Sequence, residues 1–327
     1  MTGAGTDNGS LSYARRGIAL GLFTGVVWGL DGVLLGIALA GSLGAASAAL
    51  IAISLAGAAL HDGIAAVWLL IANAASGKLR EIGRALAVRP GRIVCAAALL
   101  GGPVGMAGYL LGITHAGAAH TLAVSAIYPA IGSALAVLFL KERIPARAWV
   151  GILVCVAGAV VVGWSPPAGE RYPHFALGIA FALMAAFGWG LESVLSTRAM
   201  DVLDPEVAIN IREAVSFIVY MAVLLPVFGG LRAAAALAVS GALPLIAAAA
   251  LCGAVSYSSW YKAMNMTGAG RAMALSITYV FWSIVFCYVL PPHIKPAPGL
   301  IVGAVLISGG TLLIVGNPKE LVNLRNK

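Results

Sequence analysis

The sequence is poor in charge. Asp, Glu, Lys and Arg make up only 10% of its 327 residues, whereas hydrophobic residues make up 61%. An ordinary soluble domain has about a quarter of its residues charged. Apolar segments of roughly 18 to 25 residues follow one another with short breaks, and each is long enough to cross the hydrocarbon core of a bilayer. The composition therefore excludes a soluble globular protein and predicts a polytopic membrane protein in contact with lipid.

The common motifs of catalysis and metal binding are also missing. The chain contains no HExxH zinc motif, no GxSxG nucleophile elbow and no phosphate-binding glycine loop. Its four cysteines form neither a CxxC pair nor a metal-binding spacing, so we interpret them as small apolar packing residues. We therefore expect a protein that is not an enzyme and that needs no metal and no cofactor.

The formal net charge of +8 would be consistent with binding to nucleic acid if the basic residues were spread over the chain. Instead it follows the pattern of membrane topology, so we expect no nucleic-acid partner. The apolar pattern predicts ten spans, at about 17–40, 46–74, 91–113, 117–141, 146–164, 174–198, 205–229, 241–265, 269–290 and 298–316. With a cytoplasmic N-terminus, sixteen Lys and Arg fall inside, three fall outside and Arg212 lies within a span. This asymmetry obeys the positive-inside rule and predicts that both termini are cytoplasmic.

The second half of the sequence repeats the first. At an offset of 151 residues, Ser125 falls on Ser276 and Tyr128 on Tyr279. An offset of 161 residues brings Trp28-Gly29-Leu30-Asp31 onto Trp189-Gly190-Leu191-Glu192. Five spans per repeat force the two repeats into opposite orientations, which is the inverted-repeat plan of secondary transporters with a site near the midplane. We therefore predict an all-α integral membrane fold divided into a disordered tail (1–12), a first five-helix repeat (13–166), a second one (167–318) and a cytoplasmic tail (319–327).

Two of the acidic residues inside apolar spans each follow a tryptophan by three positions, and a carboxylate at that depth costs several kcal/mol unless it is compensated. Glu192 falls in the apolar run 175–194, and Trp189 precedes it by three residues on the same helical face. Trp28 and Asp31 repeat this arrangement. Glu192 is either a protonated carboxyl bonded to a neighbouring helix or the counter-ion of a bound cation, to which aromatic rings offer their π faces.

Aromatic residues recur at helical spacing in the later spans. Trp and Tyr are common at the lipid interface, but a Tyr hydroxyl at mid-depth needs a hydrogen-bond partner and should face protein or water. For Trp260 and Tyr109 the two interpretations are balanced. The spacing favours an aromatic cavity lined by Trp28, Tyr128, Trp189, Glu192, Tyr257, Tyr261 and Trp282, with Asp31, Met106 and Tyr279 as a second tier.

Two further couples of polar residues lie inside spans, His61-Asp62 and Arg212-Glu213. Adjacent residues point about 100° apart on a helix, so we expect neither couple to form a facing pair by itself. Pairing between helices would neutralise the buried charge. Alternatively, His61 and Asp62 form a protonation switch, since histidine titrates near neutral pH. All four residues are candidates for coupling or gating.

Several strings in the chain resemble the drug/metabolite transporter superfamily, specifically its EamA-like group. The strings GLFTGVVWGL, LHDG, GGPVGM, SAIYPAI, FGWGLESVLS and SITYVFW are similar to those of bacterial choline transporters of that group. The resemblance implies a choline-like cation held in an aromatic cage beside an acidic residue, and transport by alternating access, as import, across the bacterial inner membrane. Asp31 and Glu213 depart from the pattern, which would alter proton coupling or admit another cationic substrate.

Two functions therefore stay open. The first is transport of choline or a similar quaternary ammonium compound, with proton coupling as an added element. The second is export of amino acids or related metabolites on the same fold, which needs a partner for the substrate carboxylate; Arg212 and His61 are the mid-span candidates for that role.

Overall fold

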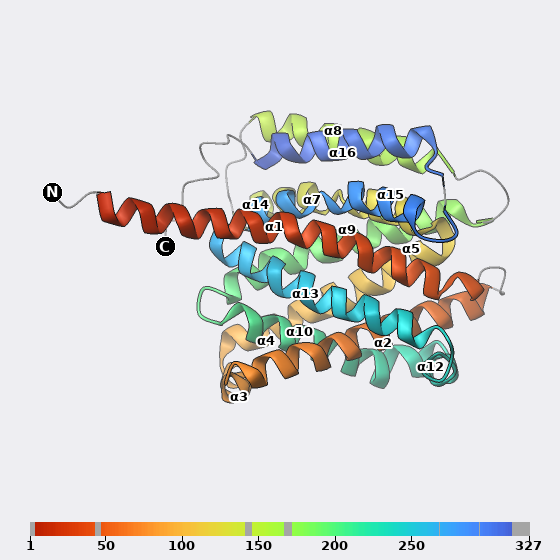
Figure 1. The fold of residues 1–327 in the computed structure, drawn as a ribbon, viewed down its shortest axis with the longest axis horizontal. Coiled ribbons are helices and arrows are strands. Elements are labelled where there is room, and N and C mark those ends of the chain that lie inside the picture. The colour runs from red at the N-terminus through yellow and green to blue at the C-terminus, as the bar shows by residue number, and fades with distance from the viewer. Residues whose placement is uncertain are drawn as a thin grey trace.

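The computed structural model describes residues 4–42, 47–140, 146–166, 172–267, 269–293 and 295–315. These residues form helices and no strand, as the sequence predicts, and the helices run roughly along the long axis of the molecule (Figure 1). The first half comprises α1 (Ala4–Ala38), α2 (Ser47–Ala75), α3 (Leu79–Ala87), α4 (Arg89–Leu99), α5 (Ala107–Ala116), α6 (Ala118–Ser125), α7 (Tyr128–Leu140) and α8 (Ala146–Gly163). The second half comprises α9 (Phe175–Ala199), α10 (Pro205–Val219), α11 (Leu225–Val227), α12 (Leu231–Ala238), α13 (Leu243–Thr267), α14 (Ala269–Ser276), α15 (Tyr279–Val289) and α16 (Pro298–Val315).

Among the described residues, six helical segments are long and apolar enough to cross a membrane, which fits a multi-pass membrane protein. They are 15–38, 48–75, 89–116, 175–199, 205–227 and 243–267. Four shorter apolar helical segments accompany them, at 118–132, 149–162, 279–289 and 298–313. Every one of these segments falls on an apolar stretch that the sequence marks as a span.

Several spans are interrupted where the backbone cannot continue a regular α-helix. A π-helical stretch, Leu100–Met106, joins α4 to α5 and contains Pro103, which lacks a backbone N–H for the helical ladder. A second π-helical stretch, Tyr220–Leu224, joins α10 to α11. The α6–α7 and α14–α15 breaks fall at corresponding places in the two halves, just before Tyr128 and Tyr279.

The structure differs from the sequence-based expectation at two short helices and at one end. Helices α3 and α12 lie in segments that the apolar pattern assigns to loops. Both are too short to span a bilayer, and α3 carries charge, so a search for long apolar runs passes over them. Helix α1 begins at Ala4, within the stretch for which the composition predicts a disordered tail; that stretch contains no proline to interrupt the backbone hydrogen bonds of a helix.

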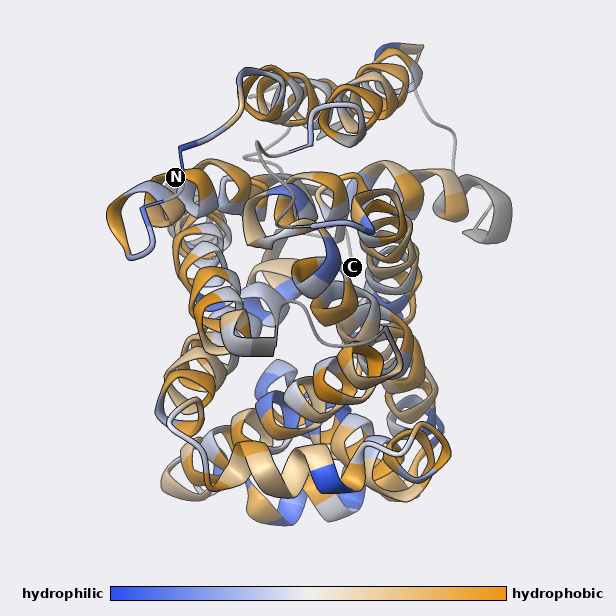
Figure 2. Cartoon of the chain, turned by 90° about the vertical axis from the view of Figure 1, so that its right-hand side faces the viewer, coloured by the Kyte–Doolittle hydropathy of each residue, from blue (hydrophilic) through white to orange (hydrophobic). Residues whose placement is uncertain are grey.

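Glycines at every fourth position of α1 allow its close packing, as small residues at that spacing predict. A methyl group at Gly17 would lie 2.7 Å from Thr267 Cγ2 of α13, and one at Gly29 would lie 2.9 Å from Trp282 Cβ of α15. Helix α1 therefore lies against α13, α14 and α15 without room for larger side chains. Helices α8 and α16 pair in a separate layer at the top of Figure 1, and Figure 2 shows that layer above the rest of the bundle from the side.

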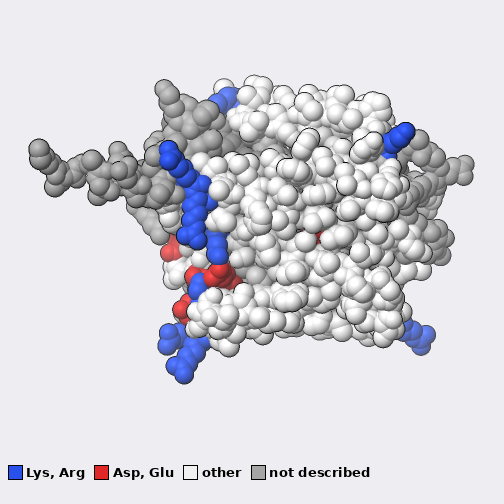
Figure 3. Space-filling view, in the orientation of Figure 1, with Lys and Arg blue, Asp and Glu red and all other residues white. Residues whose placement is uncertain are grey.

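Charge on the molecular surface gathers at one end of the bundle. In Figure 3 most of the visible Lys and Arg residues lie at the left end, and the wall of the molecule between the two ends is almost free of charge. Lys78, directly before α3, contacts Asp204 (2.8 Å) and Glu206 (2.5 Å), and Lys262 also pairs with Glu206. We call these four residues the end cluster. The uncharged wall fits contact with lipid.

Candidate functional site

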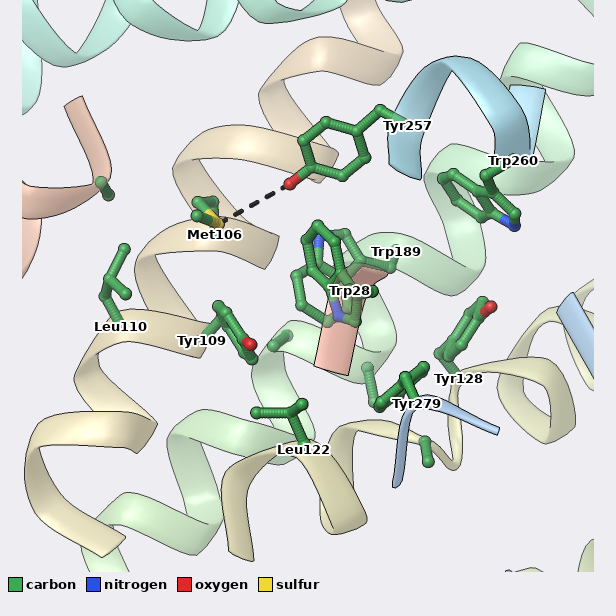
Figure 4. Packing of buried hydrophobic residues seen from close by; sticks show 14 of the residues in the cluster. Trp28, Met106, Tyr109, Leu110, Leu122, Tyr128, Trp189, Tyr257, Trp260 and Tyr279 are labelled. Atoms are coloured by element: carbon green, nitrogen blue, oxygen red, sulfur yellow. Dashed lines mark hydrogen bonds between the residues drawn. The ribbon is translucent and has the colours of Figure 1, made fainter. Parts of the chain in front are cut away.

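An aromatic pocket lies between α1, α7, α9, α13 and the α14–α15 break. Its lining is made of rings, hydroxyls and one acid: Thr24, Trp28, Tyr128, Trp189, Glu192, Ser256, Tyr257, Trp260, Ser276 and Tyr279. The cavity measures about 40 Å³, room for a few water molecules, so a larger guest must move the rings apart. Figure 4 shows Trp28 and Trp189 at its centre, with Tyr257 above them and Tyr128 and Tyr279 to the side.

The rings at the centre of this pocket contact one another closely. The Trp28 and Trp189 ring centroids are 5.4 Å apart at 81°, and Tyr257 lies 4.8 Å from Trp28. Tyr109 stacks on the other side of Trp28 at 5.6 Å. Such edge and offset contacts are the favourable arrangements of aromatic rings. Together they surround a small volume with π faces, the type of surface that attracts a cation.

The π-helical stretch around Pro103 fixes one wall of the pocket. The Trp189 indole N–H donates to the carbonyl oxygen of Gly101 at 3.1 Å. The Tyr220 hydroxyl donates to the carbonyl of Gly102 at 2.9 Å. Gly105 has no side chain, and a methyl group there would lie 2.6 Å from the Trp189 ring. The irregular backbone and its glycines therefore place Trp189 against this wall.

Glu192 is buried and already paired. Its Oε1 lies 3.1 Å from Nε of Arg212 on α10 and accepts a hydrogen bond from the Tyr261 hydroxyl at 2.8 Å. The Arg212 guanidinium in turn lies 5.2 Å from the centre of the Tyr257 ring. The carboxylate of Glu192 is therefore held by a cation on one side, while its side chain lines the pocket on the other.

Arg212 belongs to a continuous chain of buried charges, which we call the charge network: Asp31, His61, Asp62, Glu192, Arg212 and Glu213. His61 bridges two carboxylates, with Nε2 at 3.1 Å from Asp31 Oδ1 and Nδ1 at 3.2 Å from Asp62 Oδ1. Asp62 Oδ2 accepts from Ser216 and lies 3.8 Å from Arg212 Nη1. The network thus connects α1, α2, α9 and α10 through direct contacts.

The expectation that adjacent residues would not meet is wrong for both couples. Arg212 Nη1 donates to Glu213 Oε1, and His61 contacts Asp62. Both contacts form because the long guanidinium chain and the imidazole ring can turn toward a neighbour even though the two Cβ atoms diverge. The pairing between helices that neutralises buried charge is present as well, from Arg212 to Glu192 and from His61 to Asp31.

The charge network contains more acids than bases. Its four carboxyl groups face one guanidinium and one imidazole, and every member is 0% or 1% exposed. Among the described residues, Asp31 Oδ2 and Glu213 Oε2 have no hydrogen-bond partner. Buried carboxylates are stable only when they are paired or protonated. The surplus therefore calls for further positive charge, supplied either by protons or by a bound cation.

Most of the residues expected to line a cavity come together here. Trp28, Tyr128, Trp189, Glu192, Tyr257 and Tyr279 line the pocket. Tyr261 and Met106 lie behind it, bonded to Glu192 and to the Tyr257 hydroxyl respectively, and Asp31 lies in the charge network. Trp282 lies apart: its half-buried ring packs against Phe281 and Phe286, because its position on α15 faces away from the pocket that Tyr279 lines.

Two aromatic residues whose interpretations were balanced lie at the pocket or against its rings. Trp260 lines the pocket, and Tyr109 stacks on Trp28. Trp260 lies three residues after Tyr257 on α13, so the helical spacing could have placed both on one face. For Tyr109, no signal in the sequence distinguishes contact with Trp28 from contact with lipid.

A larger cavity of about 90 Å³ lies toward the other end of α1, between the α5–α6 turn and the segment that connects α15 to α16. It is lined mostly by aliphatic side chains such as Val33, Ile113 and Ile284, with Lys295 among its polar residues. None of the described residues of its lining is acidic. The aromatic pocket is therefore the better candidate for a cation. No group of three or more His, Cys, Asp and Glu able to hold a metal occurs among the described residues.

Comparison with known proteins places this geometry in a family. The EamA-like transporter family matches the chain twice, over residues 15–164 and 176–316. Protein LicB of Haemophilus influenzae is 28% identical over 216 residues, which cover 66% of this chain and 72% of that protein. A solved crystal structure of a protein 19% identical in sequence superposes with a TM-score of 0.54, covering 88% of this chain and 95% of the other, and so shares the fold.

Proposed function

The chain belongs to the EamA-like transporter family, and from that premise we propose that it carries choline or a similar quaternary ammonium compound across the membrane. The cation rests against Trp28, Trp189 and Tyr257 in the aromatic pocket, with Glu192 beside it. The observation that carries this proposal is the junction of an aromatic pocket with a charge network whose acids outnumber its bases. A permanently charged, weakly hydrated ammonium group is the guest that such a site favours.

The proposed architecture is that of ten spans in two inverted five-helix repeats. The two family matches fall one in each half of the chain and support this division. The aromatic pocket draws on both halves, since Trp28 and Tyr128 come from the first and Trp189 and Tyr257 from the second. Rocking of one repeat against the other would expose this pocket to each side in turn. The direction we propose is import across the bacterial inner membrane, with both termini cytoplasmic.

The strings that resemble bacterial choline transporters, such as GLFTGVVWGL and FGWGLESVLS, support a choline-like substrate. The alternative, export of amino acids, needs a cation to hold the substrate carboxylate. Arg212 is engaged by Glu192 and Glu213, and His61 by Asp31 and Asp62. Neither base is left over for an anionic group, so the contacts favour a cation without a carboxylate.

Proton coupling is the second part of the proposal. His61 faces Asp31 of α1, Asp62 of its own helix and the ring of Tyr257 of α13 at 6.3 Å. A proton gained or lost by this group changes the charge surplus beside Glu192, to which it is linked through Asp62 and Arg212. Protons and substrate would thus compete for, or jointly satisfy, the same buried negative charge.

Uptake into proteoliposomes tests both parts. We expect labelled choline to accumulate in a protein-dependent manner, unlabelled choline to compete and neutral amino acids to fail. An imposed pH gradient should change the initial rate if protons are coupled. Competition by amino acids but not by quaternary amines would contradict the proposed substrate. Choline uptake whose rate does not change with the pH gradient would contradict only the proposed proton coupling.

A further inference from the structure

One hydrogen-bond donor of the aromatic pocket has no partner. Among the described residues of the lining, the indole Nε1 of Trp260 is the one buried side-chain nitrogen or oxygen without a hydrogen bond. A buried N–H left unpaired is costly, and such groups are uncommon in folded proteins. Trp260 is 7% exposed and therefore cannot turn to bulk solvent to satisfy it.

The other donors beside it are occupied. The Tyr128 hydroxyl lies 2.6 Å from Ser276 Oγ, and Ser276 donates to the carbonyl of Met273. Thr24 donates to Leu20, and Ser256 donates to Gly253. Beside Tyr128, a guest with a hydrogen-bond acceptor would therefore find an open donor at Trp260.

The position of Trp260 separates this donor from the charged side of the pocket. Its ring lies 6.2 Å from Tyr128 in a T-shaped contact, and Figure 4 shows its nitrogen turned to the side of the Tyr128 hydroxyl, away from Trp28 and Trp189. The Arg212 guanidinium, which pairs with Glu192, lies over the Tyr257 ring instead. The proposed position of the cation, at Trp28 and Trp189, and the indole N–H of Trp260 thus lie on different sides of the pocket. We call the side of Trp260 the neutral end.

The neutral end distinguishes between acceptors. Among the described residues, the pocket lining contains no Lys, Arg or His. A carboxylate placed there would lose its hydration without gaining a positive partner, which a single neutral N–H does not offset. A hydroxyl is uncharged, and it accepts the one hydrogen bond that Trp260 offers while its own proton can reach a Tyr or Ser oxygen.

We propose that Trp260 is a specificity-determining residue, whose indole N–H binds the hydroxyl of a hydroxyalkyl quaternary amine and thereby selects such compounds over tetraalkylammonium ions and over carboxylate-bearing betaines. This inference rests on the proposed binding of a quaternary ammonium in the same pocket. The aromatic cage recognises the ammonium group alone. The proposed role of Trp260 adds recognition of the substituent at the other end of the substrate.

Two ligands of nearly equal size test it: choline and n-propyltrimethylammonium, in which a methyl group replaces the hydroxyl. Calorimetric titration of the wild-type protein should give choline an advantage of about 3- to 10-fold, the range of one net neutral hydrogen bond. Glycine betaine should bind more weakly than either. Trp260→Phe keeps an aromatic ring and removes the N–H, and it should abolish the preference by weakening choline alone.

The controls separate the two proposals. Trp149→Phe changes an exposed indole and should leave both affinities unchanged. Equal affinities of the wild type for choline and n-propyltrimethylammonium would overturn the inference, and this comparison needs no variant. A preference that survives in Trp260→Phe would overturn it as well, since another donor would then bind the hydroxyl. If neither quaternary amine bound the wild type, the proposed function itself would fail.

Discussion

The protein holds two groups of ion pairs with similar distances and different surroundings. In the end cluster, two lysines meet two acids, and the contacting side chains are 24% to 33% exposed. In the charge network, two bases meet four acids, and all are 0% or 1% exposed. The end cluster has equal numbers of bases and acids and is partly exposed to solvent, whereas the charge network has more acids than bases and is buried. Only the network needs something from outside the chain to neutralise it.

This contrast bears on function. Solvated ion pairs contribute about 0–1 kcal/mol each and fasten one helix end to another. Buried charges persist at much higher cost, and inside a membrane they mark pathways of ions and substrates. Placing a surplus of acid directly behind three aromatic rings gives a site at which a cation gains from both the rings and the charge.

Removing the base of each group gives the sharpest test of the contrast. Arg212→Met leaves Glu192, Glu213 and Asp62 without their guanidinium and should destabilise the protein by about 3–5 kcal/mol, the cost of breaking a buried pair. The measurement is the free energy of unfolding in detergent. A loss below about 1 kcal/mol would mean that the network is protonated and neutral rather than ionic.

Glu192→Gln removes one charge from the network and keeps the shape of the side chain. The variant should bind choline more weakly by about 1.5–3 kcal/mol, roughly 10- to 150-fold, the range of a contact with a charged group. Isothermal titration measures it. Because the substitution lowers the surplus of acid, stability should fall less than in Arg212→Met. Unchanged affinity would place the counter-ion elsewhere.

Trp189→Ala removes a ring from the pocket and leaves every charge in place. Choline affinity should fall by about 1–2 kcal/mol, the scale of a desolvated cation–π contact. Trp282→Ala is the matched control, since this ring packs against Phe281 and Phe286 outside the pocket. Equal losses in the two variants would point to a general effect on folding, and the aromatic cage would lose its support.

Lys78→Met tests the end cluster and should have the smallest effect, below about 1 kcal/mol of unfolding free energy and reduced further by salt. Although partial burial opposes it, hydrogen bonds to Asp204 and Glu206 raise the pKa of Lys78 above its ordinary value of 10.5. A raised pKa means that the contribution is fully present below about pH 10.5 and is lost as the pH rises through the folded-state pKa. The unfolding temperatures of the variant and the wild type should therefore differ at neutral pH and converge at a pH above the folded-state pKa of Lys78. A difference as large as that of Arg212→Met would erase the contrast between the two groups.

Much of the fold follows from the sequence because bilayer thickness imposes it. Apolar length locates the long helices, and the four-residue glycine spacing anticipates the close contact of α1 with α13 and α15. The search for long apolar segments does not find α3 and α12, because these helices are short and depend on packing at the ends of the bundle. The periodicity of the chain thus determines elements that cross the membrane and not those that lie at its edge.

The sequence indicates most of the residues that line the pocket, but it does not indicate which of them contact one another. Glu192, three residues after Trp189, points to the pocket, because a carboxylate inside an apolar span is costly and requires an explanation. The partnership of Glu192 with Arg212 depends on how α9 and α10 approach each other, which no local pattern encodes. The direction of a ring is equally non-local: Tyr279 lines the pocket, whereas Trp282, three residues later, faces away from it.

The most direct test of the central claim is thermal stabilisation of the purified protein by a series of ligands: choline, betaine, carnitine, ethanolamine and neutral amino acids. A ligand that binds the folded state stabilises it by mass action, by about 2.7 kcal/mol at a hundred times its Kd. We predict a saturable rise in unfolding temperature with choline and none with neutral amino acids. Stabilisation by an amino acid, with no response to any quaternary amine, would contradict the account.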